Sequence, residues 1–278
     1  MVGRLALAST LGLALPVHGV ARADAGTDET TSATSGIGPF TAASYPTELT
    51  LRPLTLPMGV AQLTAALSNA HASITLFGTT SSADVQGLGF DLRYGLTDQL
   101  EAGVTLPFVL HPDGGWGKQV GLQAHFLALD TAKVDVAPGF VLPLFTEGDA
   151  FRFVVFDALT RYLVTDQVYL FGLNDVVDVA NHSSTAASLN LNVGIGFQAA
   201  PQIALTLSTN LAHLKLSGDS NKNGFIFSDF VPLDVRALVG ISNGIDVYAE
   251  FADADLENAG TLWVIVGGLA FRLGVAGG

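Results

Sequence analysis

Apolar and polar residues alternate along most of this chain in segments of about ten residues, and a period of two is the period of a β-strand. Between positions 100 and 108, Leu100, Val104 and Phe108 fall on the even parity, whereas Glu101 and Thr105 fall on the odd parity. Such a segment forms a strand with one apolar and one polar face. Further segments with this alternation lie at 85–94, 120–128, 134–140, 154–162, 189–198, 203–211, 233–239, 245–251 and 263–273.

Tight polar turns separate these segments in pairs. The clearest turn is 97–99 (Thr-Asp-Gln), and similar turns are centred on 130–133, 165–167, 200–202 and 242–244. The first four centres lie about 34 residues apart, which fits one two-strand hairpin per repeat. Longer polar loops lie between the tight turns, at 111–118, 146–150, 175–186, 217–224 and 252–260.

Short turns on one side and longer loops on the other are the layout of a transmembrane β-barrel. With residues 59–67 as the first strand, the pattern predicts an all-β fold: an antiparallel up-and-down barrel of about twelve strands, with short periplasmic turns and longer extracellular loops. A β-sandwich would also show alternation, with its polar face in water. The barrel is favoured because strands near ten residues are long enough to cross a bilayer. The polar faces are also rich in Gly, Ala, Ser and Thr, as suits a crowded lumen.

Aromatic residues on the apolar parity gather near the ends of the expected strands. Barrels in membranes carry two such aromatic girdles, one at each interface with water. We therefore predict membrane-interface positions for ten residues. They are Tyr94, Phe126, Tyr162, Tyr169, Phe197 and Phe271 near the tight turns or the C-terminus, and Phe108, Phe140, Phe251 and Trp263 near the long loops.

The first residues predict export. Arg4 precedes an apolar run at 5–15, and the small residues Ala21 and Ala23 flank a candidate cleavage site, as in a secretory signal peptide. We therefore divide the chain into a signal peptide (1–23), a flexible periplasmic lead (24–57) and a barrel domain (58–278). The lead carries three prolines between 46 and 57, and proline removes a ladder donor. It is expected in the periplasm or tucked into the barrel mouth.

Composition agrees with a protein whose apolar surface faces lipid. The chain is 49% hydrophobic but only 13% charged, which is lean in charge for a soluble protein of this length. It has no cysteine, so disulfides are excluded. The formal net charge of −13 argues against nucleic acid as a partner, because phosphate binding needs clusters of Lys and Arg. The expected partners are outer-membrane lipid and a small-molecule solute.

Two phrases carry a resemblance to a known family. Residues 93–104 (Arg-Tyr-Gly-Leu-Thr-Asp-Gln-Leu-Glu-Ala-Gly-Val) and 52–57 (Arg-Pro-Leu-Thr-Leu-Pro) resemble Gram-negative outer-membrane barrels of the transporter-like family named for the phenol meta-cleavage pathway. The resemblance implies an outer-membrane channel or transporter for small solutes, apolar or aromatic compounds among them. It supplies no catalytic residues.

Charges on the polar parity are predicted to line the lumen. Charged groups at bilayer depth are costly unless they are paired or wetted, and they commonly mark a pathway. A passive channel or transporter is the first reading, and a structural or adhesive barrel with a plugged lumen is the alternative. The candidate lumen residues are Asp91, Arg93, Glu101, His125, Asp135, Asp157, Arg161, Asp234, Arg236, Asp246, Glu250 and Arg272.

Other chemistry has little support in the sequence. Asp219, Asn221 and Asn223 match the opening of a calcium loop, but the closing carboxylate is expected at position 230, which is Phe. A polar loop with Asn-Gly turn chemistry is the simpler account, so we expect no cofactor. Some twelve-stranded barrels are lipid hydrolases, yet no Ser-His-acid spacing stands out here. We therefore predict that the protein is not an enzyme.

Overall fold

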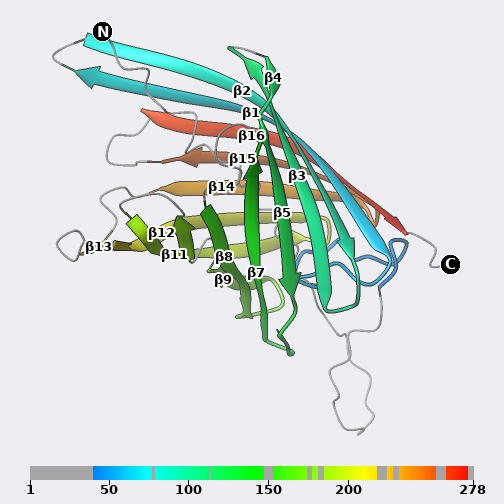
Figure 1. The fold of residues 1–278 in the computed structure, drawn as a ribbon. Coiled ribbons are helices and arrows are strands. Elements are labelled where there is room, and N and C mark those ends of the chain that lie inside the picture. The colour runs from blue at the N-terminus through cyan, green and yellow to red at the C-terminus, as the bar shows by residue number, and fades with distance from the viewer. Residues whose placement is uncertain are drawn as a thin grey trace, which may run out of the picture.

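The computed structural model describes residues 40–76, 79–112, 114–146, 153–173, 177–180, 185–217, 224–227, 232–254 and 261–274. All 16 strands in these ranges belong to one antiparallel sheet. The sheet closes on itself because the first strand pairs with the last in the described chain, from Val60 opposite Gly274 to Ala72 opposite Leu262. Figure 1 shows this ring of strands from the side. No helix among the described residues is long and apolar enough to cross a membrane.

The 16 strands fill twelve positions around the barrel, because some barrel strands are interrupted and count as two or three segments. β4, β5 and β6 together fill one place in the ring, between β3 and β7. β9 and β10 share β8 and β11 as neighbours, and β13 and β14 both pair with β12. The fold is therefore the closed twelve-stranded barrel that the alternation predicts. The strands are β1 (Val60–Leu76), β2 (Thr79–Gly95), β3 (Leu100–His111), β4 (Gly115–Trp116), β5 (Gln119–Phe126), β6 (Leu129–Asp130), β7 (Val134–Phe145), β8 (Phe153–Leu163), β9 (Val168–Gly172), β10 (Val177–Ala180), β11 (Thr185–Ala200), β12 (Ile203–Ser217), β13 (Gly224–Phe227), β14 (Leu233–Ser242), β15 (Ile245–Asp253) and β16 (Leu262–Gly274).

The five tight turns that the sequence predicts all lie at one end of the barrel, which we call the turn end. In the first turn the backbone amide of Thr97 donates to the Leu100 carbonyl. The Thr97 hydroxyl accepts a hydrogen bond from the Leu100 amide at 3.0 Å. Thr165 plays the same part in the turn before β9, where its hydroxyl accepts the Val168 amide at 3.0 Å. Such local bonds fix the register of each hairpin. We call the opposite end the loop end.

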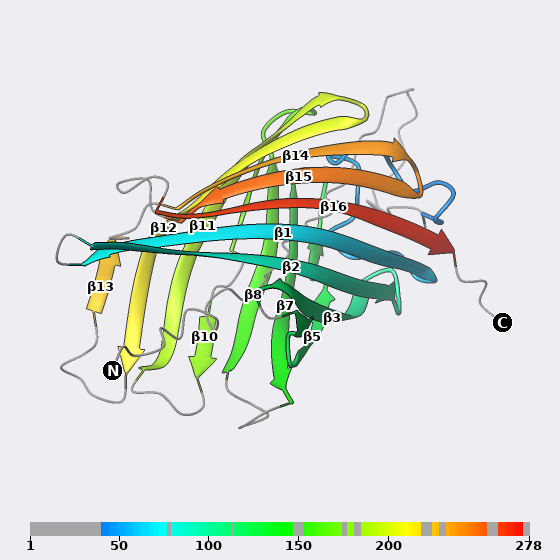
Figure 2. The ribbon, with the colours of Figure 1, turned by 90° about the horizontal axis from the view of Figure 1, so that it is seen from above.

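The first two strands differ from the sequence prediction in length. We expect strands at 59–67 and 85–94, but β1 and β2 each span 17 residues and pair from Ala61 opposite Tyr94 to Leu76 opposite Thr79. The longest ribbon in Figures 1 and 2 is this hairpin. Residues 68–84 are mostly Ser, Thr and Ala, so their alternation is too weak to show a strand. His71 lies in β1 and stacks on Trp263 with ring centroids 5.4 Å apart.

The barrel is apolar outside and polar inside. On β12 the outward Leu205 and Leu207 are 44% and 43% exposed, whereas the inward Ala204 is 1% exposed. Buried positions throughout the barrel hold Arg, Asp, Glu, Gln and Thr. This is the reverse of a water-soluble protein, in which large apolar side chains are mostly inside. A surface of this kind is stable where hydrocarbon surrounds it.

Nine of the ten aromatic residues expected at the membrane interfaces are half-buried or exposed on the outer wall. Tyr169 is the correction: it is 1% exposed and faces the lumen. Its neighbour Leu170, at 46% exposed, takes the outward position. Tyr-Leu-Phe at 169–171 is apolar at every position, so alternation alone cannot assign the faces of β9.

Residues 40–57 lie inside the barrel near the turn end, where Figure 2 shows them in blue within the ring of strands. Tyr45, Leu49, Arg52 and Leu56 are each at most 4% exposed. Of the two positions that the sequence leaves open for the lead, the described part adopts the one within the barrel. We call residues 40–57 the inserted segment.

Candidate functional site

Arg52 anchors the inserted segment to the barrel wall. Its Nη1 donates to Oδ2 of Asp246 on β15 at 2.5 Å, and its Nη2 donates to Oδ1 at 2.8 Å. Nε and Nη2 also donate to the carbonyls of Pro46 and Thr47, at 2.8 and 2.9 Å. A bidentate guanidinium–carboxylate pair is a strong and directional contact. Arg52 therefore stabilises the fold of residues 46–52 within the inserted segment and binds that part of the segment to the barrel wall.

A second arginine and a tyrosine complete this anchor. Arg272 on β16 also donates to Asp246 and to Oε1 of Gln62 on β1, at 2.8 Å. The Tyr45 ring lies 4.4 Å from the Arg272 guanidinium carbon and 5.6 Å from that of Arg52, within the range of cation–π attraction. Burial raises the pKa of the Tyr45 phenol above its ordinary value, so the phenol is neutral at pH 7.

The inserted segment is also fixed to other sides of the ring. The Leu49 amide donates to Oε1 of Gln198 on β11 at 2.7 Å. The Leu56 amide donates to Oε2 of Glu101 on β3 at 2.9 Å. These bonds, together with the anchor on β15, attach the inserted segment to three separate parts of the ring, so the segment occupies the lumen at this level.

Lumen charges on β2, β3, β5 and β8 form one connected network. Arg93 contacts Asp91 at 2.7 Å and Glu101 at 3.3 Å. His125 lies between two carboxylates, with Nδ1 3.3 Å from Glu101 and Nε2 3.0 Å from Asp157. Buried charges are stable when they are paired and hydrogen-bonded in this way. Paired side chains therefore occupy this side of the lumen.

The other predicted lumen charges pair across neighbouring strands. Arg161 on β8 binds Asp135 on β7, with Nε 2.7 Å from Oδ2, and it also donates to the Arg52 carbonyl at 3.1 Å. All twelve candidate lumen residues lie in the described strands with side chains on the inner face. Eleven of them take part in an ion pair. Asp234 lines the cavity described next, together with Arg236 and Glu250.

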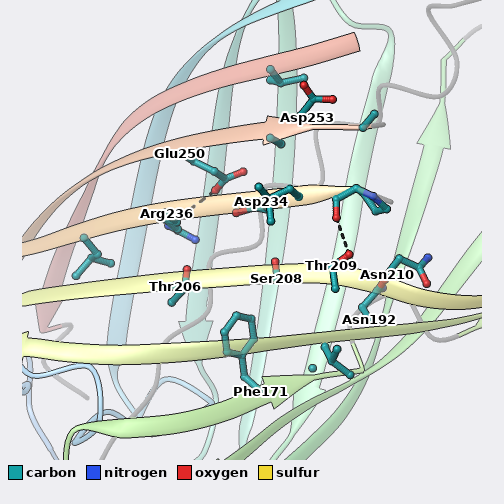
Figure 3. A pocket seen from close by; sticks show the side chains of 18 of the residues that line it. Phe171, Asn192, Thr206, Ser208, Thr209, Asn210, Asp234, Arg236, Glu250 and Asp253 are labelled. Carbon is teal, nitrogen blue, oxygen red and sulfur yellow. Dashed lines mark hydrogen bonds and ion pairs between the residues drawn. The ribbon is translucent and has the colours of Figure 1, made fainter. Parts of the chain in front are cut away.

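A cavity of about 350 Å³ occupies the part of the lumen that the inserted segment and the charge network leave free. Leu49 of the inserted segment lines it, and Asn210, Pro232 and Ala254 line it towards the loop end. Its walls come from β9, β11, β12, β14, β15 and β16 (Figure 3). We call it the lumen cavity.

Aromatic rings shape the β9 wall of the lumen cavity. Phe171 packs on Gly194, where a Cβ would lie 2.3 Å from the ring, and Tyr169 packs on Gly196, where a Cβ would lie 1.9 Å from it. The glycines on the inner face of β11 therefore make room for these rings. The sequence signals this packing by the glycines of β11. Their role can be recognised once the pairing of β9 with β11 is known.

The calcium-loop candidates Asp219, Asn221 and Asn223 lie outside the described residues. Within the described part of the chain, no group of three or more His, Cys, Asp or Glu side chains is placed to hold a metal ion. Sequence reasoning also missed Arg52 and Tyr45 as lumen residues. Both precede the strands, in a segment whose prolines indicate only that it is not a central strand.

Comparisons with known proteins agree on the fold. No family model matches the chain, and no curated protein matches its sequence. Among solved structures, an outer membrane channel from Pseudomonas putida F1 has a TM-score of 0.52 at 16% identity, and the match covers 79% of this chain and 97% of that one. The KdgM porin has a TM-score of 0.49 at 8% identity, over 74% of this chain and 98% of the porin. The match to the Pseudomonas putida structure shows that the two chains share the closed barrel fold.

Proposed function

We propose that the protein is an outer-membrane barrel that serves as a passive channel or transporter for small solutes. The observation that carries this proposal is the lumen cavity, which extends from the loop end to Leu49 of the inserted segment. A cavity of this size falls within the range of small-molecule sites. In the present conformation the inserted segment occupies the lumen between this cavity and the turn end. A solute would cross the barrel after that segment moves.

The proposed location rests on the apolar outer wall and on the fold. Large apolar side chains cover the outside of the barrel, and a barrel satisfies every backbone group between strands, as lipid requires. The signal peptide that the sequence predicts would supply export. The solutes suggested by the family resemblance, small apolar or aromatic compounds, agree with the Phe171, Leu238 and Val264 side chains along the cavity.

Planar bilayers test the proposal directly. We expect purified protein to give small unitary currents at applied voltage, which become larger when the inserted segment is released. Heat-modifiable migration on a denaturing gel checks that the barrel is folded in each preparation. Folded protein that gives no unitary current, both in the native form and after release of the segment, would contradict a channel.

The inserted segment also supports a second function, a structural or adhesive barrel with a permanently closed lumen. Arg52 is 1% exposed and bonded to Asp246, which is the pattern of a fixed plug. The same bilayer experiment separates the two functions, because a permanent plug would leave the barrel silent at every voltage.

A further inference from the structure

The lining of the lumen cavity combines apolar and charged side chains. Apolar side chains, including Phe171, Leu238 and Val264, form part of the lining. Among the Asp, Glu, Lys and Arg side chains in the lining, three carry carboxyl groups and one carries a guanidinium. Figure 3 shows these charged groups together on β14 and β15, with Phe171 across the cavity. They are Asp234, Glu250, Asp253 and Arg236.

Arg236 is already occupied by neighbouring side chains. Its Nε lies 3.9 Å from Oε2 of Glu250, and its guanidinium carbon lies 4.1 Å over the Tyr248 ring. The ring covers one face of the guanidinium, and Glu250 faces its charge. An anion that entered the cavity would therefore have to compete for the one cationic group in the lining.

The carboxyl groups outnumber this one guanidinium. Asp234 and Asp253 belong to paired strands, since Leu233 lies opposite Asp253 and Asp234 lies opposite Ala252. Both line the cavity in addition to Glu250. An excess of carboxyl groups in one cavity makes the local potential more negative, and a low-dielectric surrounding strengthens that effect. The lining is therefore better matched to a positive ligand than to a negative one.

Hydroxyl and amide groups complete the polar part of the lining. Thr206, Ser208 and Asn210 on β12, and Asn192 on β11, also line the cavity. Their oxygens can accept hydrogen bonds from an ammonium group, which carries only donors. A bare metal ion would need several oxygen ligands in close geometry and would gain nothing from the apolar wall.

We propose that the lumen cavity binds a small organic cation with an apolar body, such as a protonated aromatic or aliphatic amine. The ammonium group lies against the carboxyl groups of β14 and β15, and the apolar body extends across the cavity to Phe171 on β9. The inference rests on the proposed function, because it names the class of solute that the same cavity admits. The cavity volume of about 350 Å³ is at the small end of ligand sites, so the ligand is a small molecule.

Three probes with the same phenyl body test the charge preference: 2-phenylethylammonium, 2-phenylethanol and phenylacetate. Their dissociation constants are measured by calorimetry on the full-length protein in lipid nanodiscs, at low and at high salt. We expect the ammonium probe to bind about tenfold more tightly than the neutral alcohol, and phenylacetate to bind most weakly. The preference should shrink as salt screens the charges. Equal constants for the three probes, or tighter binding of phenylacetate, would overturn the proposal.

Two variants place the ammonium probe in this cavity. Asp234→Asn removes a lining charge and should reduce the preference severalfold, whereas Asp166→Asn makes the same change in an exposed tight turn and should leave it unchanged. Should Asp234→Asn fail to fold, Ser208→Lys adds a positive charge at the cavity wall and should shift the preference towards phenylacetate. A preference that survives in a folded cavity variant would also contradict the proposal.

The experiments can reject the proposed ligand and the proposed channel independently of each other. Unitary currents with no preference among the probes would reject the organic cation and leave the channel standing. A tenfold preference in a barrel that never conducts, even after the inserted segment is released, would reject the channel and leave a binding barrel for cations.

Discussion

Replacing Arg52 with alanine should open the lumen and raise the unitary conductance of the barrel severalfold. The substitution removes both bonds to Asp246 and the bonds to the Pro46 and Thr47 carbonyls. Breaking a buried ion pair costs about 3–5 kcal/mol when one charge is left alone. The cost here is smaller, about 2–3 kcal/mol, because Asp246 keeps its contact with Arg272.

That cost falls on the closed conformation, so the inserted segment should leave the lumen more often. A change of about 2 kcal/mol alters the ratio of closed to open forms by roughly thirtyfold. Single-channel recordings in planar bilayers would show it as larger or longer openings. The barrel itself should stay folded, because its strand pairing does not involve Arg52.

Two controls sharpen this experiment. Arg52→Lys keeps the positive charge but loses the bidentate geometry, so its conductance should fall between that of the native protein and that of Arg52→Ala. Glu48→Gln changes the charge of the same segment without touching the Arg52–Asp246 pair and should conduct as the native protein does. Arg52→Ala protein that is folded and conducts no more than the native barrel would show that the inserted segment is not a gate.

The second large effect is expected on the outer wall. Leu207→Arg on β12 should destabilise the folded barrel by about 2–4 kcal/mol if this position lies near the bilayer midplane. Leu207 is 43% exposed and lies between the outward Leu205 and Leu211, so the new charge would face hydrocarbon. Reversible urea unfolding from liposomes measures the free energy of unfolding of both forms.

The adjacent position supplies the matched control. Ser208→Arg adds the same side chain one residue further along the strand, where it points into the lumen cavity. Water and the carboxyl groups of β14 and β15 should receive it at little cost. A barrel that loses equal stability in both variants would not have hydrocarbon on one face and an enclosed lumen on the other.

The strands and their faces are readable from the sequence because alternation is a local signal. On β12, every second residue from Ile203 to Leu211 except position 209 is a large apolar residue, and the structure turns those side chains outward. The lumen charges follow from the same parity. A strand has only two faces, so fixing one of them fixes the other.

The inserted segment could not be predicted in this way. Arg52 and Asp246 are 194 positions apart, and no local period links a proline-rich lead to a strand near the other end of the chain. The presence of an arginine among apolar neighbours, Leu51, Leu54 and Leu56, is the one local hint that the lead carries a buried charge. The carboxylate that pairs with Arg52 is set by the closed barrel, which brings Asp246 beside it.

Tyr169 shows where parity itself fails. Three apolar residues in succession allow either assignment of β9, and the choice is made by the partner strand, where Gly196 leaves room for the ring. The lengths of β1 and β2 are set in the same way. Their weakly alternating ends are strands because they pair with each other, a fact that neither end shows alone.

Nitroxide scanning along β12 tests most directly whether lipid meets the apolar face while the charged face is enclosed. The chain has no cysteine, so single cysteines at 205, 206, 207 and 208 can be labelled without background. In liposomes, the labels at 205 and 207 should collide with oxygen, and those at 206 and 208 with a water-soluble nickel chelate. Equal accessibility at all four positions, or the opposite alternation, would contradict the barrel as a membrane protein.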